Sequence, residues 1–132
     1  MSGKFVIGKE IARDQLDWGQ MGWISRPANA ARQICEIEVK LEPGFGHNFH
    51  KHPRQEEVIY VMAGEIEQWL ETGKRTLKPG DAVFIPPNVV HASFNTGQQT
   101  AKLLVVLSPC VGDGGYELAD VSADAPWNSL RK

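Results

Sequence analysis

Apolar and polar residues alternate along much of the middle of the chain, which is the pattern of a half-buried β-strand. The clearest example is residues 34–41, where from Cys35 onward every second residue is apolar and the residues between them are charged. Because successive side chains of a strand point to opposite faces, the apolar set is predicted to face a core and the charged set to face water. The predicted inward set is Cys35, Ile37, Val39 and Leu41.

Other short runs rich in aromatic, aliphatic or β-branched residues predict the remaining strands. These runs are residues 5–7, as an edge strand, and residues 17–27, 58–62, 82–85, 91–95 and 100–107. Hairpin turns are predicted at Thr72-Gly73 and Thr96-Gly97. One short helix is predicted over residues 122–130, with Asp124 as its cap and Pro126 in its first turn. The pattern therefore predicts an all-β fold with a short C-terminal helix.

Length and charge narrow the class of protein. A chain of 132 residues with 42% hydrophobic residues is long enough for one domain with a core and too short for two ordinary domains. The net charge of −2, from 14 basic and 16 acidic residues, provides no basic surface for nucleic acid or for an anionic membrane. We therefore expect neither nucleic acid nor a membrane as a partner.

The beginning of the chain and its cysteines bear on localisation. The first residues contain no long apolar region, so no signal peptide is expected. Cys35 and Cys110 are far apart in the sequence and form no pairing motif, which favours two reduced thiols. Both observations predict a cytoplasmic protein.

Three histidines and one glutamate stand at spacings that suit a single metal ion. His50 and His52 are two residues apart, so on a strand they would share a face. Glu57 opens the next predicted strand, and a bend between the strands would return it to the histidine pair. His91 follows the turn at residues 86–88 and begins another strand. Buried histidines can instead be satisfied core residues, but four donors in one pattern favour a metal site over that reading.

The glycines and prolines around these donors complete two motifs. The first runs from Gly44 through His50, His52 and Glu57 to Gly64, and the second from Gly80 through His91 to Asn95. In this order, and separated by only residues 65–79, they resemble the two motifs of the cupin family. Asn88 stands where that family usually has Gly, and Asn also accepts a positive φ. The resemblance covers residues 35–107.

The resemblance implies an antiparallel jelly-roll barrel, or double-stranded β-helix, with the metal site inside one end. On this view residues 34–108 form the barrel core, residues 1–33 form an N-terminal segment with edge strands, and residues 109–132 form a tail. A homodimer is also implied, and the N-terminal segment with Trp18 and Trp23 is the expected contact.

The resemblance further implies one divalent transition metal (Fe, Mn, Ni, Zn, Co or Cu) held by His50, His52, Glu57 and His91. Four protein ligands would leave positions for substrate, which is typical of a catalytic site. We therefore expect a metal-dependent enzyme that acts on a small organic molecule, either as a dioxygenase or as a Lewis-acid isomerase or lyase. The alternatives are a non-catalytic cupin that binds a small molecule or sugar, and a sensor domain.

Several further residues are assigned by their face. Residues that share a face with the ligands, or that line the barrel, are expected to line the pocket: Cys35, Ile59, Val61, Val89 and Ser93. His47 is expected on the face opposite His50, and Tyr60 and Phe94 are expected to pack between the sheets. Arg26 is either an exposed residue or a binder of a substrate carboxylate, and Trp127 is expected to anchor the tail.

Overall fold

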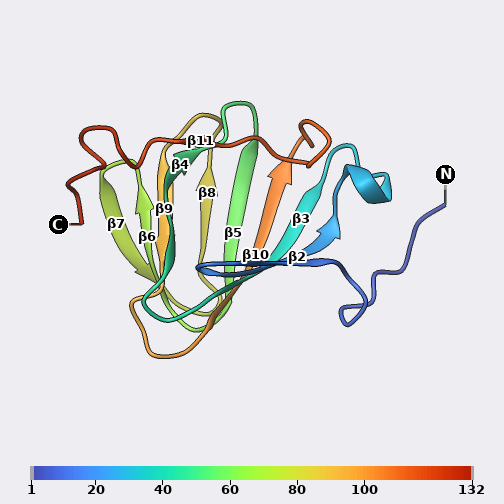
Figure 1. The fold of residues 1–132 in the computed structure, drawn as a ribbon, viewed down its shortest axis with the longest axis horizontal. Coiled ribbons are helices and arrows are strands. Elements are labelled where there is room, and N and C mark those ends of the chain that lie inside the picture. Colours follow the sequence, from blue (N-terminus) through green and yellow to red (C-terminus); the bar gives the residue numbers. More distant parts are fainter. Residues whose placement is uncertain (1, 132) are drawn as a thin grey trace.

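The computed structural model describes residues 2–131, which form two antiparallel β-sheets packed face to face (Figure 1). One sheet has six strands in the order β1-β2-β3-β10-β5-β8, and the other has five in the order β11-β4-β9-β6-β7. The strands are β1 (Arg13–Leu16), β2 (Gly19–Ser25), β3 (Cys35–Leu41), β4 (Gly46–Lys51), β5 (Glu56–Ala63), β6 (Ile66–Leu70), β7 (Gly73–Leu77), β8 (Ala82–Ile85), β9 (His91–Phe94), β10 (Ala101–Ser108) and β11 (Ala119–Asp120). The predicted all-β jelly roll is confirmed.

The main core lies between the sheets and follows the alternation seen in the sequence. β3 and β10 pair in register and bury every second residue. The predicted inward set of β3 is confirmed, because all four of its members are buried. These four side chains pack with buried apolar residues of β2, β5 and β10, so the six-stranded sheet provides most of the apolar lining of the barrel.

A second apolar cluster covers the outer face of the five-stranded sheet. Phe49, Trp69 and Phe94 project from β4, β6 and β9, and the C-terminal segment packs Trp127 and Leu130 over them. This cover explains why all four residues of β9 are buried, since both of its faces are shielded from water. Trp127 anchors the tail, as the sequence analysis predicted.

The predicted C-terminal helix is wrong. Residues 122–130 form consecutive turns, in which the Asn128 N–H donates to the Asp124 carbonyl at 2.9 Å and the Ser129 N–H to the Pro126 carbonyl at 3.1 Å. A proline in the first turn does not itself prevent a helix. The path of this segment is instead set by Trp127 and Leu130, which pack on the five-stranded sheet. Among residues 2–131 the only helical element is a single 3₁₀ turn, Pro27–Asn29, and no helix is long and apolar enough to cross a membrane.

Two other expectations about the surface are also wrong. No strand includes residues 5–7, and the side chain of Phe5 is 98% exposed, because no neighbouring strand pairs with this short run. Tyr60 is 43% exposed on the outer face of the six-stranded sheet, which no layer of the described chain covers. Phe94 is buried as expected, but beneath the C-terminal segment and not between the sheets.

Candidate metal centre

Both sheets supply side chains to the candidate metal site. His50 lies on β4 and His91 on β9, and these two residues are direct cross-strand partners. His52 follows the end of β4, and Glu57 reaches the site from β5 of the opposite sheet. The ligand atoms of the three histidines all lie within 4.8 Å of one another. Glu57 Oε1 lies 2.8 Å from His91 Nε2 and 3.4 Å from His52 Nε2.

Backbone carbonyls orient all three imidazoles. His50 Nδ1 lies 2.6 Å from the Asn48 carbonyl, His52 Nδ1 lies 2.6 Å from the Glu117 carbonyl, and His91 Nδ1 lies 3.0 Å from the Val89 carbonyl. A carbonyl oxygen can only accept, so each Nδ1 donates its hydrogen. In a neutral imidazole the other nitrogen, Nε2, is then an unprotonated acceptor. Outer hydrogen bonds of this kind are typical of histidines that bind metals.

Burial favours the neutral form of two of these histidines, and Glu57 stays ionised. Burial lowers the pKa of His50 well below its ordinary value and also lowers that of His52. Burial alone would raise the pKa of Glu57, but positive charge adjacent to its carboxylate holds it below its ordinary range. The site therefore presents lone pairs and a negative charge to one small volume.

Two of these acceptor atoms have no hydrogen-bond donor. His91 Nε2 and Glu57 Oε1 are both buried and unpartnered, although they lie only 2.8 Å apart. Two unprotonated acceptors at that separation repel unless a cation or a proton lies with them. Nitrogen and carboxylate donors suit a divalent transition metal, so these residues fit such an ion.

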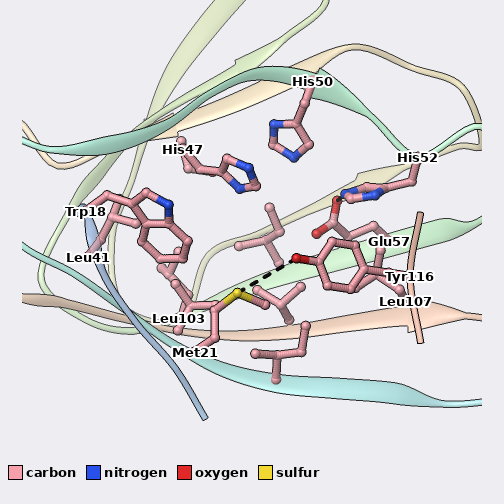
Figure 2. A pocket seen from close by; sticks show the side chains of 15 residues that line it. Trp18, Met21, Leu41, His47, His50, His52, Glu57, Leu103, Leu107 and Tyr116 are labelled. Carbon is pink, nitrogen blue, oxygen red and sulfur yellow. Dashed lines mark hydrogen bonds and ion pairs between the residues drawn. The ribbon is translucent and has the colours of Figure 1, made fainter. Parts of the chain in front are cut away.

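Three residues of the site, His50, His52 and Glu57, form one wall of a pocket of about 50 Å³ inside the barrel, and His91 lies behind this wall (Figure 2). That volume holds only a few water-sized groups. Apolar side chains of the six-stranded sheet form much of the lining, and aromatic side chains flank it. The lining residues outside the ligand set are Trp18, Met21, Ile37, Val39, Leu41, His47, Ile59, Ser93, Leu103, Val105, Leu107 and Tyr116.

Of the residues predicted to line the pocket, Ile59 and Ser93 do so. Val61 and Cys35 are fully buried in the core, and Val89 packs against its edge, outside the pocket lining. Burial raises the pKa of the Cys35 thiol to about 11. Arg26 stacks over the ring of Trp23, with Cζ 4.5 Å from the ring centre, and does not line the pocket.

His47 lies in the pocket, and its expected placement on the opposite face is wrong. The register between β4 and β9 shifts between His47 and His50, so simple alternation fails across this irregularity. His47 stacks on His50 with ring centres 3.8 Å apart and on Trp18 with centres 5.5 Å apart. Burial lowers the pKa of His47 to about 4, so its imidazole is neutral at pH 7.

Sequence reasoning missed Trp18, Met21 and Tyr116 as pocket residues. Trp18 and Met21 lie in or beside the predicted run 17–27, but nothing in that run indicates which side chains reach the metal site. Tyr116 lies on the tail, and its place depends on the path of the chain after β10. Local patterning contains no information about that path.

Comparisons with known proteins agree with this fold. A family model described as "Cupin domain" matches residues 37–107, more than half of the chain. Polyketide synthase CurC of Streptomyces cyaneus is 30% identical over 126 residues, which span 95% of this chain and 82% of CurC. Protein SchB of Streptomyces halstedii is 38% identical over 69 residues, which span about half of each protein (52% and 50%).

A solved structure extends the likeness to the whole fold. The polyketide cyclase RemF from Streptomyces resistomycificus superposes with a TM-score of 0.75 over 98% of this chain and 99% of its own. Its sequence identity is 20%, so it supports the architecture alone.

Proposed function

Given that this chain belongs to the cupin family, we propose that it is a metal-dependent enzyme acting on a small, partly apolar carbonyl compound. The observation that carries the proposal is the pair of buried, unpartnered acceptors, His91 Nε2 and Glu57 Oε1, beside the imidazoles of His50 and His52. These four residues would hold one divalent transition metal. When bound, such an ion would act as a Lewis acid that polarises a substrate oxygen.

The remaining residues of the pocket would bind and orient the substrate. The apolar wall from β3, β5 and β10 excludes water and suits a hydrocarbon portion of the molecule. Because the cavity is only about 50 Å³, it would admit the reacting end of a substrate, with the rest lying toward the half-buried Trp18 and Tyr116. The name of CurC, a relative over nearly the full chain, supports a polyketide-like compound as the substrate.

The test is elemental analysis of protein purified from its natural host without a chelator or an affinity metal. Near-stoichiometric manganese, nickel, cobalt or zinc supports Lewis-acid chemistry, and cyclisation or isomerisation of small polyketone compounds would then be assayed first. Iron or copper would shift the assay to oxygen-dependent cleavage of the same class of compound. A folded protein that neither contains nor takes up metal would contradict the proposal and favour a non-catalytic binding domain.

A further inference from the structure

The segment Gly115–Glu117 is fastened to the motif that contains the metal ligands. Gln55, which is 1% exposed, donates through Nε2 to the Gly115 carbonyl at 3.1 Å and accepts at Oε1 from the Glu117 N–H at 3.1 Å. The Glu117 carbonyl accepts the hydrogen of His52 Nδ1 at 2.6 Å. The residues before and after position 116 are thus both bound to the loop between β4 and β5.

Packing and charge restrict the path of this segment further. Gly115 has a φ of +97°, and a Cβ placed there would lie 3.0 Å from Cys35 Sγ and 3.1 Å from Pro27 Cδ. On the outer side, Arg54 donates to both carboxylate oxygens of Glu117, at 2.8 and 2.9 Å. Tyr116 therefore belongs to a fixed part of the tail.

This fixed segment places the Tyr116 side chain in the pocket, with its hydroxyl directed toward the centre (Figure 2). The ring packs edge-on against His52, with centres 5.8 Å apart, and stacks on Trp23 with centres 6.0 Å apart. The hydroxyl contacts Met21 Sδ at 4.0 Å, and a thioether is a weak acceptor. A better acceptor in the pocket would take this hydrogen.

Several other polar hydrogens in and beside the pocket are already engaged. Ser93 Oγ donates to Gln68 Oε1 at 2.6 Å. The Nδ1 hydrogens of the three ligand histidines go to backbone carbonyls, as described above. The phenol thus offers a substrate a donor whose present partner is poor.

The opposite side of the pocket is aromatic and flat. Trp18 and His47 stack with an angle of 12° between their planes, and His47 continues the stack onto His50 at 17°. Figure 2 shows this stack across the pocket from the Tyr116 ring, with Met21 and Leu103 along the lower side of the view. A flat molecule fits beside such a stack better than a bulky aliphatic one.

We propose that Tyr116 is a substrate-binding residue, which donates a hydrogen bond to a ketone or enol oxygen of a planar substrate lying beside the Trp18–His47 stack. This inference rests on the proposed function for the class of substrate. On binding, the Tyr116 hydroxyl exchanges the thioether of Met21 for an oxygen acceptor.

The experiment uses tropolone, a flat ring with adjacent carbonyl and hydroxyl oxygens, and follows its ultraviolet absorption as protein is added. The dissociation constant is measured for the full chain and for Tyr116→Phe, in cobalt-loaded and in metal-free protein. Tyr60→Phe is the matched control, because it removes the chain's other phenol from the outer surface. Cobalt content and melting temperature are measured for every protein, after the titration as well as before it.

The expected result is a dissociation constant about five- to tenfold higher in Tyr116→Phe, the effect of one hydrogen bond, with cobalt content unchanged and Tyr60→Phe like the parent. Equal affinity in Tyr116→Phe and the parent would overturn the proposal, as would loss of cobalt from Tyr116→Phe, which would make the residue part of the metal site. Failure of the parent to bind cobalt would contradict the proposed function instead. The comparison in metal-free protein would then still decide the role of Tyr116.

Discussion

The direction of each imidazole at this site is set by the backbone and not by other side chains. His50 and His91 each donate to the carbonyl two residues earlier, so the backbone just before each residue orients its imidazole. His52 depends on the tail through the Glu117 carbonyl. The ligand set is therefore held in position before any ion binds, which reduces the cost of ordering it.

The first prediction, at the scale of single residues, tests which side chains of the site bind the metal ion and which only lie beside it. His91→Ala or Glu57→Ala removes a donor from the site and is expected to lower metal content to a small fraction of the parent's, measured by elemental analysis after dialysis. Barrel folding, measured by circular dichroism, is expected to persist. His47→Ala is the matched control, because His47 stacks on His50 without belonging to the ligand set.

Two results from these variants would change the assignment of the metal ligands. Full metal retention in both His91→Ala and Glu57→Ala would contradict the ligand assignment. Loss of metal from His47→Ala alone would place a different histidine at the centre of the site.

A second prediction concerns the cysteines. The thiolate is the reactive form, and burial raises the pKa of Cys35 to about 11, so very little thiolate exists at pH 8. Cys35 is also inaccessible, whereas Cys110 is half-buried. We expect iodoacetamide to modify Cys110 much faster than Cys35 in the folded protein, as followed by peptide mass spectrometry. In guanidinium chloride both should react at similar rates, and equal rates in the folded protein would contradict the burial of Cys35.

The ligand residues could be predicted from the sequence because their relation is local. His50 and His52 share a face through the two-residue period of a strand, and Asn88 has the positive φ of 67° expected at the turn before His91. His47 could not be placed in this way, since a register shift of the strand pair lies between it and His50. One extra residue in a strand reverses the face of the sheet that is predicted for every side chain beyond it.

Among the elements, the long alternating strands were predictable, whereas several shorter strands and the terminal segments were not. β3 and β10 are long, regularly alternating runs whose pattern determines both their structure and their buried face. Residues 122–130 contain turn and helix signals in one short stretch, and tertiary packing of Trp127 and Leu130 decides between them. A short segment without a regular pattern takes the conformation that buries its large side chains best.

The tail provides the third prediction. Trp127→Ala removes a half-buried aromatic side chain from the cluster of Phe49, Trp69 and Phe94, and is expected to lower the free energy of unfolding by about 1–3 kcal/mol in urea titrations. Phe5→Ala is the control, because Phe5 is 98% exposed and its removal should change stability little. Metal content should be unchanged in both, since this cluster lies on the face of the sheet away from the site. Equal stability of the two variants would contradict the anchoring role of Trp127.

At the scale of the whole molecule, one face remains uncovered. Val58 and Phe84 are direct cross-strand partners on the outer face of the six-stranded sheet, and Tyr60 and Met62 continue the apolar stripe along β5. All four side chains are between 39% and 54% exposed. A sheet with one solvated face ordinarily carries polar residues there, so this stripe is unusual for an isolated chain. The sequence alone could not predict this exposed stripe. Both sheets have apolar side chains on their outer faces, and only the structure shows that the tail covers one of the two faces.

The last prediction is that this protein is a homodimer in solution. The N-terminal segment was expected to form the contact, but Trp18 and Trp23 turn inward. The exposed large apolar residues of this segment are Phe5, Val6, Ile7 and Leu16. A stable interface buries about 1,200–2,000 Å² in total, which the outer stripe and this segment together could supply. Light scattering at micromolar concentration should therefore give twice the chain mass of 14.6 kDa.

Two variants test where the contact lies. Phe84→Glu should yield monomers, because it places a charge in the interface. Lys102→Glu changes a charge on the neighbouring strand β10 without adding one to the stripe, and it should leave the dimer intact. A monomeric parent protein at this concentration would contradict the prediction, and a dimer that persists in Phe84→Glu would move the contact to the N-terminal segment.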